Sequence, residues 1–126
     1  MTTDRELLEA AARAYWGDSD VTFRFDEQEN AIVYIDANNQ DHNGRDIELL
    51  WLPLLDDGDA LRLAVKLRIS VYHAPSGFSL AVSADGSVSF KEEAIGEQNT
   101  RRAIVRAAAA MTAGKPELQA PKTSAP

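Results

Sequence analysis

The sequence contains no cysteine, which limits the chemistry open to its 126 residues. Disulfide frameworks, thiolate zinc sites and cysteine nucleophiles are excluded, and the absence is consistent with a reducing compartment. With 44% hydrophobic and 26% charged residues, the chain has the composition of an ordinary folded protein. Its length is close to the modal domain size and predicts one domain.

Long hydrophobic runs are also missing from the sequence. No apolar run approaches the roughly 20 residues that a membrane-spanning helix needs. The opening residues, Met-Thr-Thr-Asp-Arg-Glu, do not have the character of a secretory signal. We therefore expect a soluble, cytoplasmic protein that has no contact with a membrane.

Motifs of catalysis and of cofactor binding are absent as well. The chain has two histidines and no nucleophile elbow, phosphate loop, His-Glu-x-x-His motif or dinucleotide-binding glycine pattern. The segment 39–44 matches the first half of a calcium loop, but Leu50 stands where a bidentate glutamate should close the shell. His73 has no acidic or nucleophilic residue at a motif spacing. We expect no catalytic residues, no metal and no cofactor.

Positive charge is scarce in the segment 18–59. Thirteen Lys and Arg against twenty Asp and Glu give the chain a net charge of −7, but this segment holds twelve carboxylates and only two arginines, a local net of −10. Residues 60–126 carry a net of +4. Such a field repels nucleic-acid phosphates and favours basic partners, although solubility alone can explain an acidic surface.

Three of these carboxylates, Asp56, Asp57 and Asp59, precede a helix-favouring segment and are expected to cap it. The remaining excess lies between Asp18 and Glu48, with a net of −7. Within it, the candidate partner-binding residues are Asp26, Glu27, Glu29, Asp36, Asp41, Asp46 and Glu48.

Hydrophobic periodicity predicts three helices and five strands. Thr3 and Glu6 form a capping box that should start a helix over 4–16, which Gly17 ends. The segment 36–48 is polar and is expected to be an exposed loop. The remaining helices are expected at 60–67 and from 97 or 99 to 111, and the strands at 21–26, 31–35, 69–73, 78–82 and 88–90.

These elements predict an α+β fold in the order α-β-β-α-β-β-β-α, with one antiparallel sheet of about five strands and helices packed on it. Residues 1–113 should form the single domain. Gly114 and Pro116 should stop the last helix, and residues 114–126 should be a disordered, proline-containing tail.

Several side chains are assigned to the core or the surface by the same patterns. The core is expected to include Trp51, Leu54, Leu61 and Val65, with a partner-anchoring role for Trp51 as the alternative. The serines at 76, 79, 83, 87 and 89 are expected to form the polar face of the last three strands. Arg101, Arg102 and Arg106 form a basic patch without interleaved aromatics, so direct binding of nucleic acid is not expected.

Three segments of the sequence resemble a known family. They are Trp51–Leu67 (WLPLLDDGDALRLAVKL), Thr100–Ala109 (TRRAIVRAAA) and Asp4–Ala11 (DRELLEAA). In this order they are similar to the signatures of a family of small uncharacterised proteins of tailed phages and prophages, although Leu52 stands where that family usually has Asn. The resemblance implies a sandwich-like α/β arrangement, as in the phage ABA sandwich domain, and implies no catalytic residues.

Charge and resemblance together lead to two functional expectations. The first is a non-enzymatic phage or prophage accessory protein of the host cytoplasm that binds and inhibits a host protein with a basic surface. A nucleic-acid-binding defence factor such as a CRISPR-Cas complex is the concrete form of this hypothesis, with the acidic face mimicking nucleic acid. The alternative is a phage structural or assembly protein that acts as a homo-oligomer through the last helix or the segment 49–55.

Overall fold

The computed structural model describes residues 3–119 apart from 18, 20, 76 and 93–96. Within this range the chain forms three helices and six strands. In chain order they are α1 (Asp4–Trp16), β1 (Thr22–Asp26), β2 (Ala31–Gln40), β3 (Asp46–Trp51), α2 (Asp57–Leu67), β4 (Ser70–His73), β5 (Ser79–Val82), β6 (Ser89–Glu92) and α3 (Glu97–Gln119). The α+β class is confirmed.

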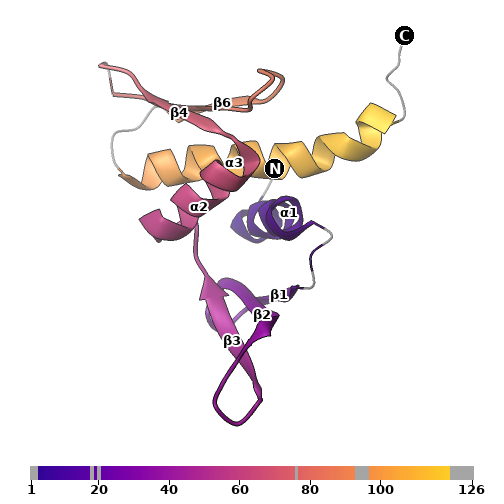
Figure 1. Cartoon of the computed structure of the whole chain (residues 1–126). Helices are drawn as coiled ribbons and strands as arrows, with labels where there is room; N and C mark the ends of the chain where they lie inside the picture. Colours follow the sequence, from indigo (N-terminus) through magenta and orange to yellow (C-terminus); the bar gives the residue numbers. More distant parts are fainter. Residues whose placement is uncertain (1–2, 18, 20, 76, 93–96, 120–126) are drawn as a thin grey trace.

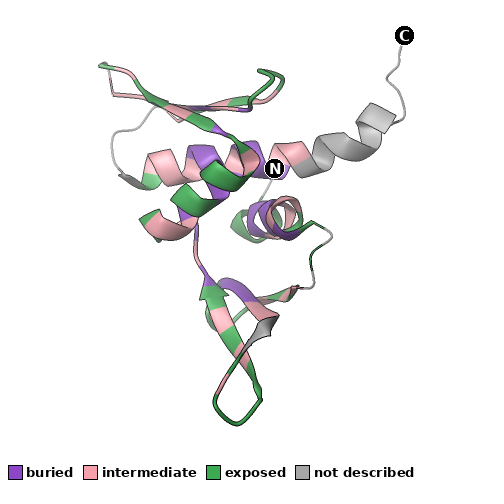
Figure 2. Ribbon diagram, in the orientation of Figure 1, coloured by how far each residue is buried: buried purple, intermediate pink, exposed green. Residues whose placement is uncertain are grey.

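The strands form two separate antiparallel sheets, β1-β2-β3 and β4-β5-β6, with the helices in a layer between them (Figure 1). The prediction of one sheet of about five strands was wrong on this point. The helix α2 separates the two groups of strands in the sequence, and each group packs on a different helix, the first mainly on α1 and the second on α3. The core therefore lies among the helices and on the inner faces of the two sheets (Figure 2).

Helix α1 begins and ends where the sequence predicts. The Thr3 hydroxyl accepts a hydrogen bond from the Glu6 amide at 3.1 Å, and the Glu6 carboxylate accepts one from the Thr3 amide at 2.8 Å. Gly17 closes the helix with a φ of 50°, which favours glycine. At this end of the helix, Trp16 packs against Trp51, Phe23 and Tyr34 with ring centroids 4.8–5.4 Å apart.

The first sheet is larger than its apolar residues indicate. Strand β2 continues to Gln40 and pairs with β3 from Asp46, so most of the segment predicted as a loop at 36–48 is a hairpin with a tight turn at 41–45. Strand β1 pairs only with Ala31–Ile35 of β2. The distal part of the hairpin extends beyond the helices (Figure 1) and has no apolar face, so hydrophobic periodicity gives no sign of it.

Helix α2 is capped as expected, but it buries a narrower apolar face than the sequence pattern predicts. Asp56 is the N-cap and its carboxylate accepts a hydrogen bond from the Asp59 amide at 2.8 Å. Leu63 is fully buried, whereas Leu61 and Val65 are 63% and 69% exposed, so their assignment to the core was wrong. Because α2 contacts the other helices along one side only, it has no partner for a second apolar stripe.

The second sheet turns small residues inward. Ser79, Ala81 and Ser83 are buried against the helices, whereas Leu80 and Val82 lie on the outer face. The expectation that all the serines form the polar face was wrong for Ser79 and Ser83; Ser76 lies outside the described residues. Small side chains allow β5 to approach the alanine-rich α3 closely, and the Ser79 hydroxyl bonds the Thr100 hydroxyl at 2.8 Å.

Helix α3 is the central element of the helical layer and is buried nearly all round over residues 103–109. Its three arginines tie it to three other elements: Arg101 to Asp57 of α2, Arg102 to Asp4 of α1, and Arg106 to Glu92 of β6. The helix continues past Gly114 and Pro116 to Gln119, so these residues do not end it. Residues 120–126 lie outside the described residues, and the predicted tail stays a prediction there.

Candidate functional site

The seven candidate carboxylates lie in three places along the first sheet. Asp26, Glu27 and Glu29 belong to the β1–β2 turn, whereas Asp41 and Asp46 flank the β2–β3 turn. These two turns are at opposite ends of β2, whose ten residues span about 30 Å at the usual rise per residue. Asp36 and Glu48 lie between them. Asp18 and Asp20, at the start of the acidic segment, are outside the described residues.

The carboxylates of the β1–β2 turn take part in the fold. Asp26 accepts hydrogen bonds from the amides of Gln28 at 2.9 Å and Glu29 at 3.2 Å, and it pairs with Arg24 at 3.2 Å. The amide of Glu29, followed by the Arg24 guanidinium, holds the pKa of Asp26 below its ordinary value. Glu27 pairs with Arg5 of α1 at 3.1 Å. These groups mainly fix the turn and dock it on α1.

The carboxylates of the distal hairpin are farther from the helices. We call residues 36–48 the acidic hairpin; it carries Asp36, Asp41, Asp46 and Glu48 with Arg45 as its single arginine. Asp41 accepts hydrogen bonds from the amides of Asn43 at 2.8 Å and Arg45 at 2.9 Å, which shapes the turn. Asp46 accepts one from the Gln40 side chain at 3.2 Å. The tip of the hairpin is exposed (Figure 2).

Glu48 connects the hairpin with the outer face of the first sheet. It lies 3.7 Å from Arg24, which also pairs with Asp26, so one arginine bridges β3 and the end of β1. The side chains of Arg24 and Glu48 are both more than half exposed, and such ion pairs contribute little to stability. This pair therefore holds Glu48 only weakly.

The Asp56–Asp59 cluster has structural partners throughout. Asp56 caps α2, and Asp57 pairs with Arg101 at 2.5 Å. Asp59 accepts hydrogen bonds from the Leu52 amide at 2.8 Å and from Arg62 at 2.5 Å, which fixes the entry to the helix. The expected capping role is confirmed for Asp56, and Asp57 and Asp59 lie in the first turn of α2.

Trp51 belongs to the core. Its side chain is 2% exposed and stacks on Tyr15 at 5.4 Å between ring centroids. A partner could not contact this ring without displacing α1, so the core assignment holds and the anchoring alternative does not. Its indole Nε1 is buried and has no hydrogen-bond partner among the described residues.

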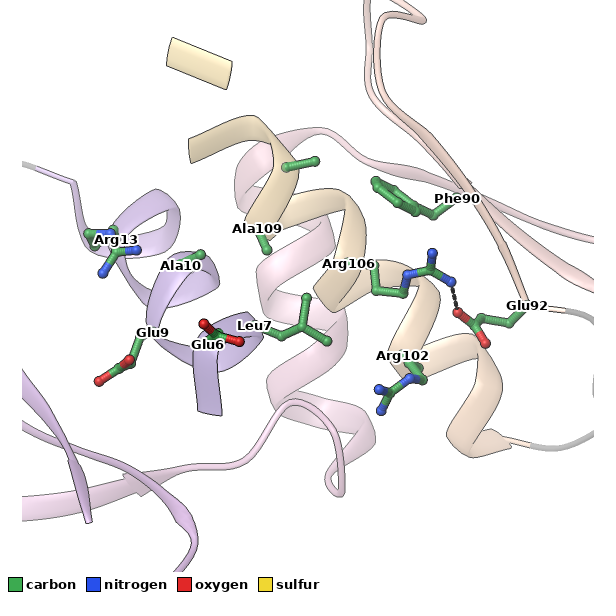
Figure 3. Close-up of a pocket in the computed structure, with 11 residues that line it drawn as sticks. Glu6, Leu7, Glu9, Ala10, Arg13, Phe90, Glu92, Arg102, Arg106 and Ala109 are labelled. Atoms are coloured by element: carbon green, nitrogen blue, oxygen red, sulfur yellow. Dashed lines mark hydrogen bonds and ion pairs between the residues drawn. The ribbon is translucent and has the colours of Figure 1, made fainter. Parts of the chain in front are cut away.

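A groove of about 880 Å³ lies where α1 crosses α3 beside β6 (Figure 3). Arg13 comes from α1, Arg102 and Arg106 come from α3, and Phe90 and Glu92 come from β6. Arg106 pairs with Glu92, and its guanidinium lies 4.6 Å from the centre of the Phe90 ring. No sequence pattern indicates this groove, because its α1 wall lies more than 75 residues away in the chain from the residues of β6 and α3.

A polar cluster at the second sheet was also missed. His73 Nδ1 lies 3.4 Å from the Ser79 hydroxyl, which bonds Thr100, and a cavity of about 350 Å³ adjoins His73 and Thr100. Ser79 is buried, and no carboxylate of the described residues bonds His73. The cluster therefore has neither an accessible nucleophile nor an oriented base, and it joins β4, β5 and α3.

Within the described residues, no helix is long and apolar enough to cross a membrane. The same part of the chain brings no three His, Asp or Glu side chains together as a group that could hold a metal ion. Comparisons with protein-family models, curated proteins and solved structures find no match to this chain. The resemblance to the phage family thus stays a prediction.

Proposed function

We propose that this chain is a non-enzymatic phage or prophage accessory protein that binds a basic surface of a host protein through the acidic hairpin. The observation that carries the proposal is the projection of this hairpin beyond the body of the molecule (Figure 1). Strand β1 begins at Thr22 opposite Ile35 and does not extend along the rest of β2, so residues 36–48 reach outward with pairing between β2 and β3 alone.

The shape of the hairpin supports insertion into a groove. A two-stranded ribbon presents both of its faces and its tip to a partner, and here the tip is polar and exposed. Asp36, Asp41 and Asp46 are distributed along it, and Glu48 stands at its base. A partner groove lined by Lys and Arg would complement this surface and accelerate association.

Occlusion is the mechanism that we propose. The hairpin carboxylates would compete with DNA or RNA phosphates for the arginines and lysines of a nucleic-acid-binding host factor. A defence complex of the CRISPR-Cas kind is the concrete candidate, supported by the negative field of the first sheet and by the phage-like sequence segments. Its action would take place in the host cytoplasm.

The test compares two triple variants that remove equal charge at opposite ends of β2. D36N/D41N/D46N neutralises the acidic hairpin, and asparagine at 41 can still accept the turn hydrogen bonds. D26N/E27Q/E29Q neutralises the β1–β2 turn as the control. Each variant is used to capture partners from host lysate, and the affinity for the captured protein is measured from 50 to 500 mM salt.

We expect the hairpin variant to bind the captured protein at least about tenfold more weakly, mainly because association is slower. Its affinity should also lose most of its dependence on salt. The control should bind almost as well as the natural chain. Equal losses in both variants would point to net charge alone, and unchanged binding in the hairpin variant would refute the proposal.

A second candidate function is a phage assembly protein that forms a homo-oligomer. It is favoured by the exposed apolar side chains Leu55, Leu61, Val65 and Tyr72. Of the two surfaces first suggested, the last helix is less suitable because α3 is buried over 103–109. The segment 49–55 is divided: Trp51 and Pro53 are in the core, whereas Leu50 and Leu55 are exposed. Native mass spectrometry decides between the two: a stable oligomer that L61K/V65K dissociates supports assembly, and a monomer excludes it.

A further inference from the structure

The groove between α1, α3 and β6 has a volume of about 880 Å³, which lies within the usual range for small-molecule sites. Its walls are formed by one face of each helix. On α1 these are residues 6, 9, 10 and 13, and on α3 they are residues 102, 106, 109 and 110, spacings that place each set on a single helical face.

We call the apolar lining of the groove its floor: Leu7, Ala10, Ala109 and Ala110. The Phe90 ring lies at the β6 side (Figure 3). Alanines leave room above the helix surfaces for a flat or extended hydrocarbon body. The floor therefore suits the apolar part of a ligand that has a single polar end.

The acidic side chains of the groove already have partners. Glu6 closes the capping box with the Thr3 amide, Glu9 pairs with Arg5 at 3.4 Å, and Glu92 pairs with Arg106. These contacts hold each carboxylate to a donor of the protein itself. A cationic ligand would have to break one of these contacts to gain a carboxylate.

The arginines differ in how firmly they are held. Arg13 is exposed, and its guanidinium has no ion pair or hydrogen bond within the described residues. Arg102 pairs at 2.9 Å with Asp4, and because both side chains are substantially exposed, this pair is readily exchanged. Of the charged groups that line the groove, Arg13 is thus the one that no described residue pairs.

We propose that this groove binds a small amphipathic carboxylate, an alkyl or aryl acid. Its carboxylate pairs with Arg13, and its apolar body lies on the floor of the groove. A guanidinium offers two parallel N–H donors that match a carboxylate. Phe90, held in place by the guanidinium of Arg106, flanks the apolar body. The site is independent of the acidic hairpin and holds whether or not the hairpin binds a partner.

The experiment titrates the full chain with sodium decanoate by calorimetry and by amide NMR. We expect saturable binding with a dissociation constant of about 1 mM or tighter, with shifts at Ala10, Ala109 and Ala110. R13Q should weaken binding about tenfold. R45Q removes the same charge from an exposed arginine at the tip of the hairpin, and it should bind decanoate like the natural chain.

Two further measurements keep the result decisive. A110F fills the floor of the groove without changing any charge and should abolish decanoate binding. This variant still tests the proposal if circular dichroism shows that R13Q folds poorly. Decanol and decyltrimethylammonium should bind at least about tenfold more weakly than decanoate. The proposal would be overturned if decanoate showed no saturable binding, or if R13Q and R45Q bound it equally. Undiminished binding by A110F, or equal binding of the cationic analogue, would overturn it as well.

Discussion

At the scale of single residues, the carboxylates of this protein divide into those that build the fold and those left at its surface. Asp26, Asp41, Asp56 and Asp85 each accept backbone hydrogen bonds at a turn or a helix cap. Because these contacts are local, they form whatever the rest of the molecule does. The negative charge of a sequence segment therefore overstates the charge that is free to attract a partner.

The first prediction concerns Asp85 in the β5–β6 turn. The amide of Ser87, followed by the hydroxyls of Ser87 and Ser83, lowers the pKa of Asp85 from 3.8 to about 2. A lowered pKa means that the ionised carboxylate stabilises the folded state above about pH 4, and that this contribution is lost as the pH falls through about 2.

D85N keeps an acceptor in the turn but cannot ionise. Urea unfolding at a series of pH values should show the natural chain to be more stable than D85N at pH 6, with the difference shrinking towards pH 2. A difference that stays constant with pH would mean that the charge of Asp85 plays no part.

A second prediction uses two leucines of the same helix. Leu63 is fully buried and Leu61 is 63% exposed. L63A should lower the free energy of unfolding by about 2–5 kcal/mol, because it removes buried methyl groups and leaves a cavity. L61A should change it by at most about 0.5 kcal/mol in the monomer. Chemical denaturation measures both, and similar losses would contradict the burial of α2.

At the scale of elements, α3 is the central helix, and it contacts both other helices and the second sheet. Its apolar residues pack on more than one side, and its arginines reach α2, α1 and β6. The acidic hairpin is the opposite case, since its distal part extends away from the described helices (Figure 1). The elements that hold the fold together thus differ from the one that we propose for partner binding.

The third prediction compares two neighbouring arginines of α3. The side chain of Arg101 is 15% exposed; it donates to the Leu54 carbonyl at 3.0 Å and pairs with Asp57. R101Q should therefore cost about 1–3 kcal/mol of stability. R102Q removes only an exposed pair with Asp4 and should cost about 0–1 kcal/mol. Thermal and urea unfolding measure the stability lost in each variant. A larger loss for R102Q than for R101Q would refute the prediction.

The fourth prediction is that the acidic hairpin can be changed without loss of the fold. D36N/D41N/D46N should unfold within about 1 kcal/mol of the natural chain, because the tip of the hairpin is exposed and Asn at 41 preserves the turn. Amide exchange should confirm that β3 near Trp51 stays protected. A cooperative loss of the whole first sheet would show that these carboxylates support the core.

At the scale of the whole molecule, one helical layer serves two sheets. Within the described residues each sheet has helices on one face only, and most of the buried hydrophobic residues form one cluster through the middle (Figure 2). Each sheet has only three strands and buries its apolar face on the helices, so its stability depends on that packing. The two ends are therefore expected to unfold together.

The fifth prediction tests this coupling. Both tryptophans, Trp16 and Trp51, lie at the first sheet, with ring centroids 5.0 Å apart, so their fluorescence reports on one end of the molecule. Circular dichroism at 222 nm reports on all three helices. The two unfolding curves in urea should coincide. A fluorescence transition at lower urea than the dichroism transition would show that the first sheet opens independently.

Local features of the fold could be read from the sequence with accuracy. The Thr3–Glu6 capping box, the Gly17 helix end and the Asp56 cap depend on residues within a few positions of each other. The distal part of β2 and β3 could not be read, because a solvated ribbon has no apolar periodicity. The exposure of Leu61 and Val65 was missed because a helix pattern does not say how many of its sides meet a neighbour.

The sequence by itself determined the α+β class, most of the element boundaries and the uneven distribution of charge, since each follows from short-range contacts and composition. Only the tertiary structure decided that the strands form two sheets, that β5 turns serine and alanine inward, and that the candidate carboxylates lie at opposite ends of β2. It alone also brought Arg13 and Arg106 to the same groove. These outcomes depend on which elements pack together, and that is fixed by long-range burial of surface and not by any local pattern.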